Sequence, residues 1–427
     1  MHVPRSGYRH YVLAVLLGGY LVNSLDRSIL SLLIEPIRLE FGLSDTQLGV
    51  LSGLAFALFY SALAIPIAAL ADRWNRRNVL ALSVLLWTFM TALCGVAGSF
   101  MALLMARIGV AIGEAGCNPA SHSLLADYYA PERRATALGI YALGAPAGTL
   151  LTGLIGGWGG EHLGWRGTMF LVGTPGLLLV PLLFLTVAEP QASPQPLAAR
   201  SPERSSLGSS LHYLWSQRSF RHLCVACALH SFAMYGAAGF NPAYLARSHG
   251  WKSFQIGQLV ALMGVAGLVG SFVGGLVTDR LGRRGGEPRW QLWAPGIAAL
   301  IVIPVQMVAY LGSGPVIVAA LLLSSALSLV FFGPSYAAAQ ALAAPQMRAV
   351  AASVLLFSKA LIGMGLGPLL IGIVSDRLAP AAGQQSLRFS LLLLVPLFNL
   401  WAAWHFFVAA RHVGADLQRS APARKYG

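Results

Sequence analysis

Long apolar segments alternate with short polar connections along nearly the whole chain. A helix needs about 20 apolar residues to cross the hydrocarbon core of a bilayer. Twelve segments reach that length, at residues 11–35, 48–71, 79–98, 101–125, 134–157, 166–187, 222–246, 255–278, 291–312, 315–341, 349–375 and 388–410. Apolar residues run continuously within them instead of alternating, which argues against a membrane β-barrel. The pattern predicts an all-α integral membrane protein with twelve transmembrane helices.

Composition supports this prediction. Of the 427 residues, 56% are hydrophobic and 10% are charged, whereas soluble domains carry roughly 25% charged residues. The basic N-terminal stretch resembles the start of a secretory signal. However, the first apolar segment is too long for a signal, contains Asp26 and Arg27, and has no small-residue cleavage site. We expect it to remain in the protein as the first span.

The net charge of +14 is distributed unevenly between the connections. If both termini are cytoplasmic, 20 of the 29 lysines and arginines lie in inner segments, 6 in outer segments and 3 within spans. An excess of basic residues on the cytoplasmic side is typical of membrane proteins. We therefore expect a plasma (inner) membrane protein with both termini in the cytoplasm, and no nucleic-acid partner.

The two halves of the chain repeat each other. "AALADRWNRRN" follows the second segment and "GGLVTDRLGRRG" follows the eighth, while "PERRATA" at 131–137 matches "PQMRAVA" at 345–351. Two six-helix halves in parallel repeat are an architecture of secondary transporters. We expect a first half at 1–187, a second half at 221–410 and a basic cytoplasmic tail at 411–427. The Pro- and Ser-rich residues 188–220 between the halves are expected to form a cytoplasmic linker, with a short interfacial helix near its end.

The repeated D-R-x-x-R-R motif resembles the signature of the major facilitator superfamily. The first copy departs from the pattern at Ala68, where a glycine is usual, and at Asn75 in the turn. The resemblance implies that both loops act as latches between two conformations; the alternative is that they only set topology. The implied latch residues are Asp72, Arg73, Arg76 and Arg77 in the first copy and Asp279, Arg280, Arg283 and Arg284 in the second.

Within that superfamily, the first half resembles the spinster family. The resemblance rests on "NSLDRSILSLLIEPIRLEFGLSDTQLGVLSG", "RIGVAIGEAGCNPASHSLLADYYAPERRATALGIYALGAPAGT" and "LGWRGTMFLVGTPGLLL". Anion–cation symporters of the superfamily share a similar D-R in the first span and E-A in the fourth. The spinster resemblance implies that Asp26 and Glu114 couple transport to protons.

Arg107 and Glu114 are charged residues inside the fourth apolar segment. Because a charge in hydrocarbon costs several kcal/mol, we expect them to face a polar cavity. They are seven residues apart, nearly two helical turns, so they share a face. By helical rise Arg107 lies ~10 Å and Asp26 ~13 Å below the outer boundary. We therefore predict that Asp26 and Arg107 form an ion pair, which either serves transport or only holds two helices together.

Glu114 is expected to have no close cation and therefore to take up a proton readily. Arg27 either binds substrate or neutralises Asp26. Lys359 lies in the middle of the eleventh segment, where we expect its ammonium to face a cavity and attract an anion. His230, Tyr235 and Asn241 in the seventh segment are candidates for the cavity lining, with packed helix residues as the alternative. Together with Arg27 and Arg107, these residues form the predicted substrate site.

These features favour a proton-coupled secondary active transporter, not an enzyme, a channel or a receptor. No nucleotide-binding loop and no nucleophile beside a base is evident. Cationic residues suggest an anion, and the spinster resemblance suggests an amphipathic one, such as a lysophospholipid or sphingoid-phosphate-like lipid; the alternative is a small organic anion. We expect a monomer whose partners are substrate, protons and membrane lipids, with no cofactor and no metal. Cys94, Cys117, Cys224 and Cys227 are expected to be buried thiols.

Overall fold

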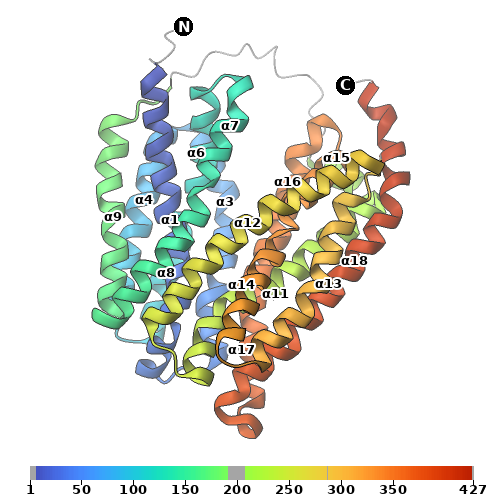
Figure 1. Ribbon diagram of the computed structural model, residues 1–427. Coiled ribbons are helices and arrows are strands. Elements are labelled where there is room, and N and C mark those ends of the chain that lie inside the picture. The colour runs from blue at the N-terminus through green and yellow to red at the C-terminus, as the bar shows by residue number, and fades with distance from the viewer. Residues whose placement is uncertain (1–5, 191–206, 286, 426–427) are drawn as a thin grey trace. The chain divides into compact units, whose positions relative to one another are not determined.

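The computed structural model describes residues 6–190, 207–285 and 287–425, and every regular element in these ranges is a helix (Figure 1). The first series comprises α1 (Ser6–Phe41), α2 (Asp45–Gly49), η1 (Val50–Leu54), α3 (Ala55–Arg73), α4 (Arg76–Val96), α5 (Phe100–Glu114), α6 (Cys117–Tyr128), α7 (Pro131–Ala142), α8 (Gly144–His162) and α9 (Gly164–Thr186). The second comprises α10 (Leu207–Ser216), α11 (Arg218–His249), α12 (Ser253–Gly285), α13 (Trp290–Leu311), α14 (Pro315–Leu329), α15 (Phe332–Leu342), η3 (Pro345–Met347), α16 (Arg348–Ser358), η4 (Lys359–Leu366), α17 (Gly367–Ala382), η5 (Gly383–Gln385) and α18 (Ser386–Lys425).

Eleven helical stretches within the described ranges are long and apolar enough to cross a membrane. The last of them, 348–419, contains both of the final two predicted spans. The chain turns between these spans at Gly383, whose φ of 54° lies in the left-handed region that glycine adopts without strain. After this turn α18 packs against α17. The prediction of an all-α membrane protein is confirmed, and each of the twelve expected spans lies in one of these stretches to within two residues at either end.

Four spans are interrupted near their middle. The fourth span breaks between Glu114 and Cys117, the fifth at Leu143 and the tenth at Val330. The eleventh passes through a π-helical turn, Lys359–Leu366. These are equivalent positions in the two halves of the repeat. Breaks of this kind expose backbone groups and side chains that a regular helix would enclose, and they are common at functional sites.

α1 and α11 end in the same way, which extends the repeat seen in the sequence. Each contains a proline in its last turns, Pro36 or Pro242. Each is followed by a glycine with positive φ, 63° at Gly42 and 66° at Gly250. A residue with a side chain would be strained in this conformation, so glycine stops both helices at equivalent points.

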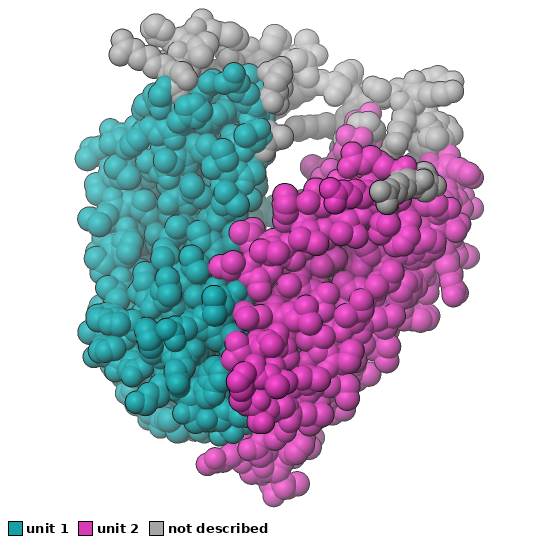
Figure 2. Space-filling view, viewed as in Figure 1, with its two compact units in different colours: residues 1–192, 239–264 teal, residues 193–238, 265–427 magenta. Residues whose placement is uncertain are grey.

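The chain forms two compact units (Figure 2). Unit 1 contains residues 1–192 and 239–264, and unit 2 contains residues 193–238 and 265–427. In unit 1, α1 packs against α8 and α9, and α4 packs against α5 and α9. In unit 2, α13 packs against α14 and α18. The sequence bounds expected for the two halves and for the linker stay a prediction, and most of the linker lies outside the described residues.

Within unit 1, glycines bring α8 and the start of α12 into direct backbone contact. A Cβ atom added at Gly153 would collide with the carbonyl oxygen of Gly257 and lie 2.5 Å from the nitrogen of Ala261. A Cβ added at Gly157 would lie 2.9 Å from the Cα of Gly257. Small residues four apart allow helices to approach this closely in a membrane.

All four cysteines are unpaired and buried, as predicted. Cys94 and Cys117 belong to unit 1, and Cys224 and Cys227 belong to unit 2.

Candidate functional site

A buried ion pair joins α1 to α5 inside unit 1. Arg27 donates hydrogen bonds from Nε and Nη2 to Glu114 Oε2, at 2.9 and 2.8 Å. Its Nη2 also donates to Asn23 Oδ1 at 3.2 Å. The Glu114 side chain is fully buried, whereas that of Arg27 is 28% exposed. The expectation that Glu114 lacks a close cation is therefore wrong.

Asp26 has a different partner from the one predicted. Its Oδ2 accepts a hydrogen bond of 2.5 Å from the Thr91 hydroxyl on α4. Arg107 forms no direct salt bridge with Asp26 among the described residues, although its charge acts on the Asp26 carboxylate. The predicted ion pair is therefore not closed in this conformation. Depth in the membrane alone did not predict the ion pair correctly. Two residues at the same depth can form an ion pair only if the rotation of their helices also directs them toward each other. The rotation of α1 directs Asp26 toward Thr91 on α4 and Arg27 toward Glu114 on α5.

Several buried polar atoms of this cluster find no hydrogen-bond partner within the described part of the chain. They are Asp26 Oδ1, Glu114 Oε1, and Nε and Nη1 of Arg107. Arg107 is only 1% exposed and lies over the Phe56 ring, with 5.4 Å from its Cζ to the ring centroid. Leaving buried polar groups unsatisfied is costly. The cluster can therefore accept a proton at a carboxylate oxygen and an anion at Arg107.

Local structure explains how Glu114 reaches this position. A Cβ added at Gly113 would lie 2.6 Å from the Trp87 backbone nitrogen, so glycine lets α5 approach α4 closely. α5 then ends at Glu114 itself. The carboxylate thus lies at the end of the helix where the backbone dipole is negative. This placement favours either a cation next to the carboxylate or its protonation.

Unit 2 contains a second buried cation. Lys359 is 6% exposed and begins the π-helical turn of the eleventh span. Its Nζ lies 4.2 Å from the centroid of the Phe332 ring, 5.0 Å from that of Phe331 and 5.2 Å from that of Tyr336. Within the described ranges, no carboxylate pairs with this ammonium. Three aromatic rings stabilise it without neutralising its charge, so it can attract an anion.

The three polar candidates of the seventh span have different surroundings. His230 is buried, and its Nδ1 and Nε2 lie 2.8 Å from Asn399 Oδ1 and from the Ser328 carbonyl oxygen, respectively. Substrate could bind to this ring only if one of these contacts were broken. Asn241 is 6% exposed and Tyr235 is half-buried. Their contribution to a substrate site stays a prediction.

The first latch motif is part of a charged network. Arg76 pairs with Asp127 at 2.5 Å and with Glu189 at 2.8 Å, and it donates to the Ser123 hydroxyl. The Arg77 backbone N–H also donates to Glu189. The sequence analysis missed Asp127 and Glu189, although both are acidic residues next to basic connections.

The remaining latch residues make fewer contacts. Arg283 Nε donates to the Asp279 carbonyl oxygen at 3.2 Å, and Arg73 and Arg280 are exposed. The side chains of Asp72 and Arg284 are not among those that the structure describes. The latch role of both motifs stays a prediction.

A family model decides the classification. The model of the Major Facilitator Superfamily matches residues 16–368. The chain belongs to the major facilitator superfamily. It is therefore an integral membrane protein of a transporter family.

Other members of the superfamily resemble the chain over most of its length. An MFS-type efflux pump of Mycolicibacterium smegmatis is 34% identical over 97% of this chain and 95% of its own. The crystal structure of a bacterial homolog of the human lysosomal transporter Spinster, inward-facing and unoccupied, is 31% identical; the match covers 97% of this chain and 99% of that one, with a TM-score of 0.88. The predicted resemblance to the spinster family is confirmed. A cis,cis-muconate transport protein of Acinetobacter baylyi is 28% identical over 62% of this chain and 65% of its own.

A further ionic cluster lies at the ends of α1 and α11 that carry the repeated Pro and Gly. Arg247 pairs with Glu35 at 2.6 Å and with Asp45 at 2.8 Å, and Glu35 also pairs with Arg38. All of these residues belong to unit 1. The sequence analysis counted Arg247 only toward topology, because hydropathy does not indicate which acids lie beside a terminal arginine.

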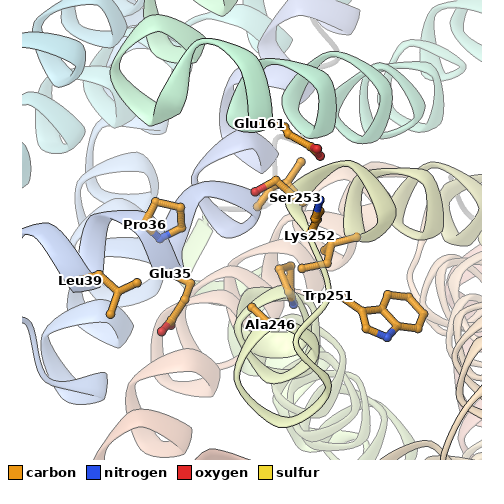
Figure 3. Close-up of a pocket in the computed structure, with 11 residues that line it drawn as sticks. Glu35, Pro36, Leu39, Glu161, Ala246, Trp251, Lys252 and Ser253 are labelled. Carbon is orange, nitrogen blue, oxygen red and sulfur yellow. The ribbon is translucent and has the colours of Figure 1, made fainter.

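A recess of about 450 Å³ adjoins this cluster. Figure 3 shows how α1, α8, α11 and the start of α12 surround it. Its charged residues are Glu35, Glu161 and Lys252, and Trp251 also contributes. Glu161 accepts a hydrogen bond of 3.3 Å from the Phe254 backbone N–H and so stabilises the start of α12. In this member of the superfamily, an ion pair thus joins α1 to α11 beside the recess, and a hydrogen bond joins α8 to the start of α12.

Proposed function

We propose that this transporter moves an anionic amphipathic substrate by alternating access and couples the movement to protons. One observation carries the proposal: each unit contains a buried cation that forms no direct ion pair among the described residues, Arg107 in unit 1 and Lys359 in unit 2. A buried cation without a directly bound counter-ion is costly in a membrane. The binding of an anion offsets that cost, which makes both side chains suitable for substrate binding.

Glu114 and Asp26 are the proposed proton carriers. Each is buried and has one carboxylate oxygen with no partner among the described residues. A proton on Glu114 would remove its attraction for Arg27 and release that arginine. Arg27, which is partly exposed, would then be free to contribute to substrate binding.

Aromatic rings favour a substrate with an apolar part. Phe56 and Tyr60 flank the arginines in unit 1, and Phe331, Phe332 and Tyr336 surround the lysine in unit 2. A lysophospholipid or a sphingoid-phosphate-like lipid has both an anionic head group and an apolar chain. The second candidate is a small organic acid, which the similarity to a cis,cis-muconate transport protein favours.

The protein is proposed to reside in the plasma (inner) membrane with both termini in the cytoplasm, because this orientation places most basic residues inside. The Arg76 network and the second D-R-x-x-R-R copy are proposed to act as latches that break and reform during the transport cycle. His230, Tyr235 and Asn241 are the proposed polar lining in the seventh span.

Purified protein in liposomes tests the proposal. Lysophosphatidylglycerol and cis,cis-muconate serve as the two probes, and each is measured with and without an imposed proton gradient. We expect saturable, gradient-dependent transport of lysophosphatidylglycerol. Arg107→Met and Lys359→Met should each reduce transport strongly. Arg289→Met, which removes a half-buried arginine paired with Glu287 at 3.6 Å, is the control for loss of charge.

Transport of muconate alone would favour the small-acid candidate. Unchanged transport in both cavity variants would contradict the proposal that these cations bind substrate.

A further inference from the structure

His230 lies between two oxygen atoms that can only accept hydrogen bonds. Its Nε2 is 2.8 Å from the Ser328 carbonyl oxygen, and its Nδ1 is 2.8 Å from Asn399 Oδ1. The orientation of the Asn399 amide is fixed by its nitrogen, which donates to the Val395 carbonyl oxygen at 3.1 Å and to Gln306 Oε1 at 2.9 Å. The oxygen of that amide therefore has to face the imidazole.

A neutral imidazole has only one N–H group. Whichever nitrogen of His230 lacks the proton directs a lone pair at an oxygen lone pair 2.8 Å away. A doubly protonated imidazole satisfies both contacts. His230 and Asn399 are each 1% exposed and Gln306 is 2% exposed, so water does not readily replace either acceptor. Of the possible protonation states, only the imidazolium form satisfies both acceptors.

Burial of the ring opposes this form, and so does the charge of Lys359. Phe331 separates the two side chains: the His230 ring packs edge to face on Phe331 at 4.6 Å between centroids, and Lys359 Nζ lies 5.0 Å from the same ring. The other helices around the imidazole offer uncharged groups, namely Gln306 on α13, the Ser328 carbonyl on α14 and Asn399 on α18. Lys359 is the charged group that acts on His230 within the described residues.

We infer that His230 is a proton-binding site whose occupancy is controlled by the anion on Lys359. This inference rests on the proposed binding of an anion at that lysine. Without an anion, burial and the ammonium together keep the imidazole neutral. A bound anion offsets the ammonium charge, the free ring nitrogen takes a proton from water, and the new N–H group donates to the oxygen that faces it. Unit 2 then gains one proton for each anion bound, separately from the carboxylates of unit 1.

NMR of protein labelled with ¹⁵N-histidine and held in lipid nanodiscs tests the inference directly. The chain has ten histidines, so His230 is assigned as the signal that disappears in His230→Gln, or in His230→Asn if the first variant does not fold. In the wild-type protein, the His230 imidazolium signal is followed as the pH is raised. In Lys359→Met we expect this signal to persist to a higher pH than in the wild-type protein, because the like charge is gone. Arg289→Met should leave it unchanged.

The same titration with lysophosphatidylglycerol or cis,cis-muconate separates this inference from the proposed function. Either probe should move the wild-type titration in the direction that Lys359→Met does, and should have no further effect in Lys359→Met. If Lys359→Met shifts the signal but neither probe does, the proposed binding of an anion at Lys359 is contradicted. Proton binding at His230 would still be supported. If Lys359→Met leaves the His230 titration unchanged, the inference is overturned.

Discussion

Two neighbouring residues of α1, Asp26 and Arg27, face different helices. Consecutive residues of a helix are separated by about 100° around its axis. Asp26 therefore reaches Thr91 on α4, while Arg27 reaches Glu114 on α5. Arg107 is left against the Phe56 ring without an ion pair among the described residues. The Asp26 carboxylate is thus hydrogen-bonded to a hydroxyl, whereas the Glu114 carboxylate is paired with a cation.

Glu114→Gln tests the proposed proton carrier. The amide has the same shape and still accepts a hydrogen bond from Arg27, so we expect the variant to fold. It cannot bind or release a proton, and gradient-driven accumulation in liposomes should fall to the level seen without a gradient. Exchange of substrate across the membrane at equal pH should continue. Full gradient-driven accumulation would move the coupling role to Asp26.

Arg27→Met tests the energetics of the buried pair. The change leaves a buried carboxylate without its cation, which costs at most about 3–5 kcal/mol, and less here because Arg27 is 28% exposed. The double variant Arg27→Met/Glu114→Gln should recover part of that loss, since the uncompensated charge is gone. Chemical denaturation in detergent micelles measures both. Equal destabilisation in the single and double variants would show that the pair contributes nothing.

The buried charged residues of the candidate site could be found from the sequence, but their pairing could not. A charge in an apolar segment is conspicuous, which is why Asp26, Arg107, Glu114 and Lys359 stood out. Pairing depends on the rotation of each helix about its axis, and apolar segments with lipid on one side and protein on the other give little periodic signal for it. Aromatic partners such as Phe56 were missed because phenylalanine is ordinary in a transmembrane segment.

At the scale of elements, hydropathy located every span but not the breaks within spans. Apolar composition continues through Leu143 and Val330, so a window average does not change there. Glycine and proline clusters next to these points, such as "GAPAG" and "FFGPS", were the available signals. Their effect depends on neighbouring helices that replace the lost backbone hydrogen bonds, and a single segment does not reveal those neighbours.

The contact between α8 and α12 provides a test at this scale. Gly257→Leu would place a side chain where the backbone of α8 lies, and overpacking of this kind costs about 1–3 kcal/mol. We expect faster amide hydrogen exchange in residues 253–261, because the start of α12 must move away. Gly275→Leu is the matched control on the same helix, since a Cβ added there meets nothing within 4 Å. Equal exchange in both variants would contradict a role for the glycine contact.

At the scale of the whole molecule, charge determines how the chain is threaded through the membrane. The excess of lysine and arginine in alternate connections predicts that both termini are cytoplasmic. Six spans in each expected half would place both termini on one side of the membrane, and the charge distribution predicts which side that is. The family and fold were accessible from the sequence for this reason: they depend on segment length, charge and a repeated motif rather than on contacts between particular side chains.

Reporter fusions test the orientation. Alkaline phosphatase, which is active only outside the cytoplasm, should be inactive when fused after residue 425 and active when inserted between Gly250 and Trp251. A fluorescent protein that matures only in the cytoplasm should show the opposite result. An active phosphatase at the C-terminus would reverse the proposed orientation and, with it, the assignment of the D-R-x-x-R-R loops to the inner side.

Burial of all four native thiols has a practical consequence. Maleimide reagents react with accessible thiolates, and a cysteine enclosed in apolar surroundings is protected from them. A single cysteine introduced at an exposed position such as Leu39 or Trp74 would therefore react well ahead of the native ones. The accessibility of a chosen position during the transport cycle can thus be followed with all four native cysteines kept in place. Their replacement, which would change the packing around them, is not needed.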